Sequence, residues 1–195
     1  MDKAINNPKR QNVLKISKDL FWKYGIKRVT IEEICKEACV SKMTFYKFFQ
    51  NKIELAKTIL DEVMNTSLNK FEELINSEIP FSEKLEGIFL MKLEGTKNIS
   101  VEFINDIYNN PESGLKKYME EIQGKSFKKI VVFYKDSQNK GYIRKDIKID
   151  FILNYSMQIM KMMENKSLVS QYENPQAFIM ESMNFMFYGI LTKNE

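Results

Sequence analysis

The sequence predicts an all-α protein of about nine helices, with three helices in a small N-terminal domain and the rest in a larger helical domain. Gly and Pro are scarce, at 7 and 4 among 195 residues, which favours long helices over a loop-rich or sheet-rich fold. Apolar residues make up 44 % of the chain, enough for a packed core, and they recur at helical spacing without a convincing strand pattern. The predicted domains cover residues 1–52 and 53–195.

Capping residues mark the three N-terminal helices. Residues 8–24 form the first, which has Pro8 in its first turn and ends at Gly25 as a left-handed cap. The second begins at the capping box Thr30-Ile-Glu-Glu33, and the third begins after a tight Cys39-Val40 connection, with Ser41 as its cap.

The larger domain begins with a long helix over about 52–76, which starts at the capping-box-like Asn51-Lys-Ile-Glu54. A turn is expected at Pro111–Gly114. Further helices are expected over about 82–96, 100–109, 115–138, 150–168 and 175–192.

Charge is distributed unevenly along the chain. Residues 1–60 carry 13 Lys/Arg and 6 Asp/Glu, whereas the remainder carries 17 and 20, so a net +7 precedes a net −3. A basic N-terminal third indicates contact with a polyanion, although a solvated charged face explains the charge equally well.

Several functional classes are disfavoured by composition. The chain has no His, which removes the commonest general base and metal ligand, and two Cys alone make a poor zinc site. No Gly-rich phosphate loop and no nucleophile–base pair stand out, so we expect no catalytic residue, no metal and no cofactor. The absence of an apolar leader or a membrane-length apolar run, together with the two closely spaced Cys, favours a cytoplasmic protein.

The second and third helices together form a helix-turn-helix. The second helix of such a motif enters the major groove of DNA. Phe45 and Phe49 fall on the side that a core would bury. The opposite side would then expose a polar arc, formed by Lys42, Thr44, Tyr46 and Lys47.

At fixed spacing, residues 24–55 carry Tyr24-Gly25, Thr30-Ile31-x-x-Ile34 and Ala38-x-Val40-Ser41-x-x-Thr44-Phe45-Tyr46-x-x-Phe49-x-x-Lys52-x-x-Leu55. This pattern resembles the signature of the TetR family of transcriptional regulators, and the resemblance covers about residues 10–60. It implies a dimeric regulator, most simply a repressor, that binds a pseudo-palindromic operator and is released by a small, largely apolar effector.

The resemblance also implies roles in DNA binding that the chemistry of the side chains supports. Lys42 and Thr44 would contact base edges, and Met43 stands where the family has a small residue or Pro, in reach of a thymine methyl group. The other candidate DNA-binding residues are expected to contact phosphate, and these are Thr30, Ser41, Tyr46, Lys47 and Lys52. Simple capping by the two hydroxyl residues and ordinary surface exposure of the lysines are the alternatives.

Two further departures from the family pattern concern the turn and the third helix. Cys39 stands where the family usually has Gly, so a left-handed backbone there would cost roughly 1–2 kcal/mol. Phe48 replaces a His or Tyr that often binds phosphate, so that contact is expected to be lost. Cys35 and Cys39 could also form a thiol sensor, but a core residue and a turn residue are the simpler interpretation.

The last two predicted helices are apolar on more than one face, so one face can meet the core and another a second copy of the chain. Following the family, we expect these helices to form the dimer interface. The candidate interface residues are Leu153, Met157, Met160, Met183, Met186, Phe187 and Ile190.

The middle helices would hold the effector pocket by the same resemblance, although each apolar residue there could be plain core. The candidate lining residues are Phe89, Leu93, Phe103, Ile107, Tyr108, Phe127, Val131 and Tyr134. Double-stranded DNA, a second copy and a small molecule are therefore the expected partners. An activator, a regulator with a protein effector, a small helical enzyme and a protein that binds a membrane surface are the alternatives.

Overall fold

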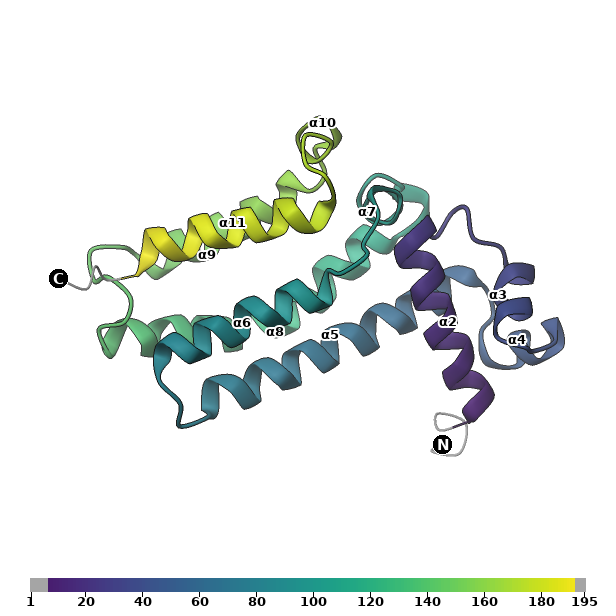
Figure 1. The fold of residues 1–195 in the computed structure, drawn as a ribbon, viewed down its shortest axis with the longest axis horizontal. Coiled ribbons are helices and arrows are strands. Elements are labelled where there is room, and N and C mark those ends of the chain that lie inside the picture. The colour runs from purple at the N-terminus through teal and green to yellow at the C-terminus, as the bar shows by residue number, and fades with distance from the viewer. Residues whose placement is uncertain (1–6, 192–195) are drawn as a thin grey trace. The chain divides into compact units, whose positions relative to one another are not determined.

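The computed structural model describes residues 7–191, apart from the side chains of Lys125 and Met160, and the described chain is helical (Figure 1). Within this range Ile143 and Leu191 form an isolated antiparallel bridge, and no strand occurs. The all-α prediction is therefore confirmed. The chain divides into two compact units, described separately below. The first runs up to Val63 and also takes Asn98–Met119, and the second holds Met64–Lys97 and residues from Glu120 onward.

The first unit is built around α2 (Pro8–Tyr24), which packs against three other helices. These are α3 (Ile31–Glu37), α4 (Lys42–Phe48) and α7 (Val101–Tyr108). The unit also contains the start of α5 (Lys52–Asn76), the 3₁₀ turn η1 (Pro111–Ser113) and the start of α8 (Leu115–Asn139). Its buried core includes Val13, Phe21, Trp22, Ile34, Phe45, Phe49, Leu55, Phe103 and Ile107.

Side-chain caps explain where the helices of this unit begin. Thr30 Oγ1 accepts the Glu33 N–H at 3.1 Å, and Ser41 Oγ accepts the Thr44 N–H at 3.1 Å. At α5, Asn51 Oδ1 accepts the Glu54 N–H at 2.8 Å, while the Glu54 carboxylate accepts the Gln50 N–H at 2.6 Å. Each cap satisfies N–H groups that a helix leaves without partners, so the predicted starts of α3, α4 and α5 are confirmed.

Gly25 ends α2 in a conformation that suits only glycine. Its φ of 81° is positive, as predicted for a left-handed cap. Its ψ of 158° is extended, however, so Gly25 is not in the left-handed helical region that the sequence predicted. The position is also crowded, because a Cβ there would lie 2.7 Å from Asp106 Oδ2 on α7. The same Asp106 oxygen accepts the Lys27 N–H at 2.7 Å, which ties the chain after α2 to α7.

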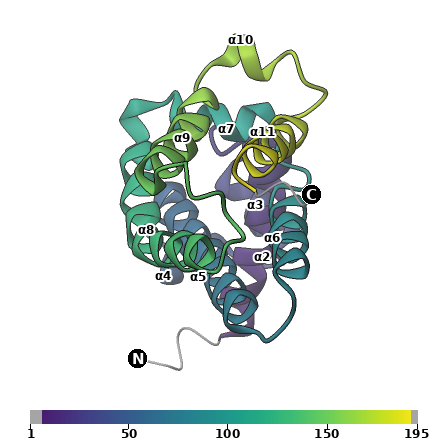
Figure 2. The same cartoon turned by 90° about the vertical axis from the view of Figure 1, so that its left-hand side faces the viewer.

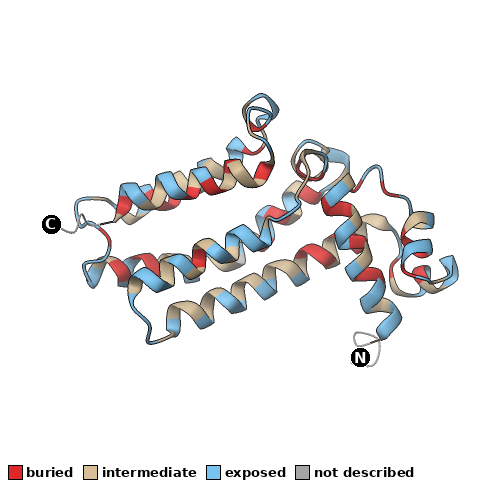
Figure 3. Cartoon of the chain, in the orientation of Figure 1, coloured by how far each residue is buried: buried red, intermediate tan, exposed pale blue. Residues whose placement is uncertain are grey.

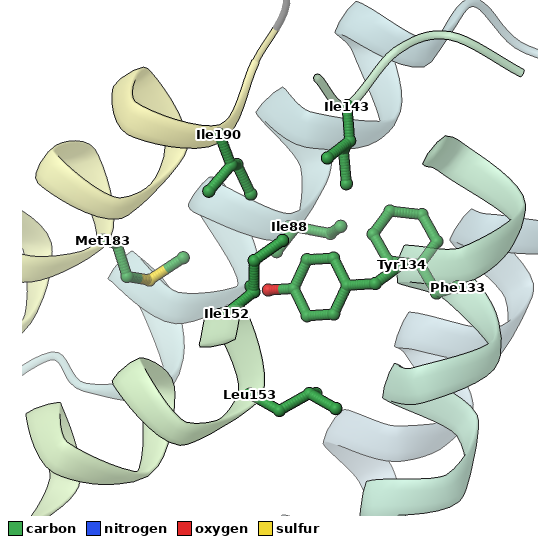
Figure 4. Close-up of a cluster of buried hydrophobic side chains, with 8 residues drawn as sticks. All are labelled: Ile88, Phe133, Tyr134, Ile143, Ile152, Leu153, Met183 and Ile190. Carbon is green, nitrogen blue, oxygen red and sulfur yellow. The ribbon is translucent and has the colours of Figure 1, made fainter. Parts of the chain in front are cut away.

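The second unit is a helical bundle whose long helices run side by side (Figures 1 and 2). It consists of the later parts of α5 and α8 with α6 (Phe81–Gly95), α9 (Ile149–Met162), α10 (Lys166–Val169) and α11 (Pro175–Ile190). Helix α11 packs against α6 and α9. Figure 4 shows its core, formed by Ile88, Phe133, Tyr134, Ile143, Ile152, Leu153, Met183 and Ile190. Among the described residues, none of the helices is both long and apolar enough to cross a bilayer.

One predicted helix of this unit is corrected by the structure. The helix expected over 150–168 ends at Met162, and a separate short helix begins at Lys166. Asn165 causes the break, because its side chain accepts the Leu168 N–H at 3.1 Å and caps a new helix instead of continuing the old one.

Tyr134 gives this core a measurable pH dependence. Burial raises the pKa of its hydroxyl to about 12, against an opposing hydrogen bond with Ser156. In the unfolded chain the Tyr134 hydroxyl ionises near pH 10. Its contribution to the free energy of unfolding is therefore fully present below pH 10 and is lost as pH rises toward 12, by up to about 2–3 kcal/mol. We expect Tyr134→Phe to flatten this part of the unfolding free energy, measured by denaturant titration from pH 8 to 12. An equal decline in both proteins would contradict the assignment.

Candidate nucleic-acid interface

Helix α4 has one buried side and one exposed side. Phe45 in the middle of α4 and Phe49, its C-cap, are 0 % and 2 % exposed and lie in the core of the first unit. The other side consists of exposed residues, which are Lys42, Met43, Tyr46 and Lys47. We call these four residues the exposed arc. Thr44, which the sequence placed on this side, is half-buried. Figure 3 shows the same division between buried and exposed residues along the helices of the unit.

Contacts from α2 hold α4 and the preceding turn in place. The Asn12 side chain donates from Nδ2 to the Ala38 carbonyl at 2.9 Å, just before the turn. The Arg10 guanidinium lies 5.4 Å from the centre of the Phe49 ring, and its Nη1 is 3.6 Å from Glu62 Oε1. Helix α2 therefore supports the helix that carries the exposed arc at its C-terminal end and through the residues before the turn.

The turn between α3 and α4 contains a strained residue. Cys39 has a φ of 52°, so the left-handed backbone considered from the sequence is confirmed. The turn is closed by the Val40 N–H, which donates to the Cys35 carbonyl at 2.9 Å. Cys39 is exposed and Cys35 is buried, and burial raises the pKa of the Cys35 thiol.

Cys39→Gly is expected to stabilise the protein by about 1 kcal/mol, because Gly adopts a positive φ without the clash of a Cβ. Thermal and denaturant unfolding would measure the change. Lys36→Gly, within α3, is the control and should destabilise by a similar amount. Destabilisation by Cys39→Gly would contradict the strain.

The polar side chains at the start of α4 already have partners within the protein. Lys42 forms an ion pair with Glu32 of α3. Their hydrogen bond raises the pKa of Lys42 and lowers that of Glu32. The hydroxyl oxygens of Ser41 and Thr44 lie 3.0 Å apart, so each partners the other.

Lys52 has a structural role that sequence reasoning missed. Its Nζ donates to the carbonyls of Lys27 and Val29, which fastens the start of α5 to the loop before α3. Burial lowers the pKa of this lysine. No local sequence signal distinguishes such a lysine from one at the surface, because both carbonyls lie more than 20 residues away. Thr30, by contrast, is exposed, and its hydroxyl caps α3.

The residues predicted to line an effector pocket fall in both units. Phe103, Ile107 and Tyr108 lie on α7 in the first unit, where the Phe103 ring centre is 4.2 Å from that of Trp22. In the second unit Tyr134 is in the core, with Phe89 and Val131 packed against it. The other two, Leu93 and Phe127, are partly exposed.

The residues predicted for the dimer interface separate into two groups. Leu153, Met183 and Ile190 are buried in the core of the second unit. Met157 is 43 % exposed. Met186 and Phe187 are half-buried, and the Met160 side chain lies outside the described residues.

A different set of side chains forms the exposed apolar face of α9 and α11. Phe151, Phe185 and Tyr188 are 60 %, 69 % and 83 % exposed. Tyr155 connects the two helices, because its ring centre is 6.3 Å from that of Phe151 and 6.2 Å from that of Phe185. We call these four residues the aromatic face. The sequence predicts that these helices are apolar on more than one face but could not indicate which face lies outward.

Comparison with known proteins matches residues 13–59 to the family described as "Bacterial regulatory proteins, tetR family". The chain is 29 % identical over 115 residues to YhgD, an uncharacterized HTH-type transcriptional regulator of Bacillus subtilis (strain 168). This match covers 59 % of the chain and 60 % of the relative, so the chain spans less than two thirds of that relative's length. It is also 19 % identical over 152 residues to the HTH-type transcriptional repressor KstR2 of Mycolicibacterium smegmatis, covering 75 % and 73 %.

Solved structures share the fold over nearly the whole chain. The fatty acid degradation regulator FadR of Bacillus halodurans superimposes with a TM-score of 0.72 at 15 % identity, covering 94 % of this chain and 97 % of that one. The ketosteroid transcriptional regulator KstR2 of Mycobacterium tuberculosis gives a TM-score of 0.63 at 16 % identity, covering 96 % and 97 %. The relatives named here are all transcriptional regulators rather than enzymes.

Proposed function

We propose that this chain, whose residues 13–59 match the TetR family, represses transcription by binding a pseudo-palindromic operator as a homodimer. The observation that carries this proposal is the exposed arc of α4, supported from behind by buried Phe45 and Phe49. A helix presented in this way fits the major groove, with its first residues toward the base edges. The cytoplasm, where the operator lies, is the location that this function requires.

Individual contacts follow from the position and chemistry of each side chain. Met43 and Thr44 would face base edges, and Lys42 would reach them by exchanging its Glu32 partner for a base or phosphate. Tyr46 and Lys47 would bind phosphate from the same arc. The other phosphate contacts proposed from the sequence are those of Thr30, Ser41 and the remaining donor of Lys52.

A homodimer is supported by the aromatic face on α9 and α11. Phe151, Phe185 and Tyr188 expose large apolar areas that a second copy would remove from water. Two-fold symmetry brings the same face of each copy together and duplicates the exposed arc. Two copies then read two half-sites about 34–36 Å apart or a multiple of that distance.

Release by a small, largely apolar molecule is the proposed regulation. The core of the second unit is rich in aromatic side chains, and Tyr134 supplies a buried hydroxyl among them. FadR and KstR2, which share the fold, are named for fatty acid degradation and for ketosteroids, and both classes of molecule are largely apolar. Helix α5 begins in the first unit and continues into the second, so an effector that shifts α5 would alter the spacing of the two arcs.

Selection from random-sequence duplexes with the purified protein tests this function. A two-fold symmetric site is expected, with affinity that falls steeply with salt. The variant carrying Tyr46→Phe and Lys47→Ala should keep its fold by circular dichroism and lose specific binding. Equal affinity for every duplex would refute the proposal, and binding to anionic vesicles that the variant retains would point to a membrane surface instead.

Glu32→Gln is expected to tighten operator binding several-fold. The substitution removes a negative charge beside the DNA and frees Lys42 from its ion pair, so one more cation can displace counterions. The expected signature is a slope of log K against log salt that is steeper by about one unit. Glu37→Gln, also exposed on α3, is the control. An unchanged slope in Glu32→Gln would place Lys42 outside the interface.

A further inference from the structure

Two apolar side chains occupy the middle of the exposed arc. Met43 is 82 % exposed and Tyr46 is 54 % exposed. They are three residues apart and therefore adjacent on the surface of α4. The other large apolar residues of α3 and α4 are buried or half-buried. Together these two side chains form a small exposed apolar surface within the exposed arc, which a partner could cover.

The polar groups near them have fewer free hydrogen-bonding positions than the sequence suggests. Lys42 is paired with Glu32, and the Ser41 and Thr44 hydroxyls partner each other. Ser41 Oγ also accepts the Thr44 N–H, so it is occupied twice. A base contact by any of these groups competes with its contact within the protein, whereas the Met43 thioether side chain donates no hydrogen bond that could compete.

The chemistry of Met43 selects one feature of the major groove. A thioether side chain offers no hydrogen-bond donor and cannot bind phosphate. The apolar group that B-DNA presents in the major groove is the C5 methyl of thymine. Methionine is flexible and polarisable, so it can adjust to that methyl group without exact geometry.

We infer that Met43, beside the Tyr46 ring, reads thymine methyl groups in each operator half-site, so that apolar contact sets specificity at that position. This inference rests on the proposed function, because it requires α4 to lie in the major groove. It predicts a thymine at the same place in both half-sites, related by the two-fold axis.

Uracil substitution tests the inference, since uracil differs from thymine only by the missing methyl group. Each thymine of the selected site is replaced in turn, and Kd is measured for the wild type and for Met43→Ala. The wild type should lose about fourfold in affinity for one half-site and about 15-fold for both, as burial of one methyl is worth about 0.8 kcal/mol. Met43→Ala should bind thymine and uracil duplexes equally at that position.

The control is Leu90→Ala, which truncates an exposed apolar side chain on α6, and it should keep the uracil sensitivity of the wild type. If the wild type selects a symmetric site but no uracil weakens binding, the inference is wrong and the proposed function stands. If Met43→Ala remains sensitive, another side chain, such as the Thr44 methyl, reads the thymine and the inference is again wrong. A protein that selects no site at all refutes both.

Discussion

Phe185→Glu is expected to convert the protein from a dimer to a monomer and to weaken operator binding by about 100-fold or more. Phe185 is 69 % exposed on α11 and joins α9 through the Tyr155 ring, so it lies centrally in the aromatic face. In a symmetric interface each substitution occurs twice. Two carboxylates would then be buried in place of two rings.

Sedimentation velocity and operator titration measure the two effects. Because Phe185 is exposed in the single chain, the folded monomer should keep its helicity. Leu90→Glu is the matched control, since Leu90 is also an exposed apolar residue of the second unit but lies on α6. A Phe185→Glu protein that remains dimeric at low micromolar concentration would remove the aromatic face from the interface.

Gly25→Ala is expected to destabilise the first unit by about 2–4 kcal/mol. Two causes act together. The backbone at φ 81° and ψ 158° is open to glycine and strained for any residue with a Cβ. The added Cβ would also lie 2.7 Å from Asp106 Oδ2 and 3.0 Å from Glu102 Cβ, so α7 must move away from the end of α2.

Denaturant unfolding of the full chain measures this loss, and reduced operator affinity should accompany it because α2 supports α4. Gly124→Ala is the control. Gly124 lies within α8 with open space where its Cβ would be, so alanine there should stabilise by up to about 1 kcal/mol. Equal effects of the two substitutions would show that the crowding at Gly25 is unimportant.

The sequence was sufficient to predict the features that depend on neighbouring residues. Thr30, Ser41 and Asn51 cap helices through bonds to residues three positions later, so their spacing identifies the starts of α3, α4 and α5. At Cys39 the resemblance to the family raised the question of a left-handed backbone, because the family usually has Gly there, and the φ of Cys39 is positive.

Features that depend on distant contacts could not be predicted in the same way. Lys52 fastens to carbonyls of the loop before α3, and Phe103 packs on Trp22, which makes α7 part of the first unit. Helices α9 and α11 are apolar on several sides, so periodicity alone did not indicate that Leu153 and Met183 turn inward. The outward face is fixed by packing between helices, which no local pattern records.

In the proposed complex the exposed arc of α4 reads DNA in two copies, which the aromatic face holds together. The most direct measurement is the mass of the complex on the selected operator, by native mass spectrometry, beside the affinity for a duplex that carries one half-site. Two chains per symmetric operator are expected, with half-site binding weaker by about 100-fold. One chain bound per operator, with the half-site bound as tightly as the full site, would contradict it.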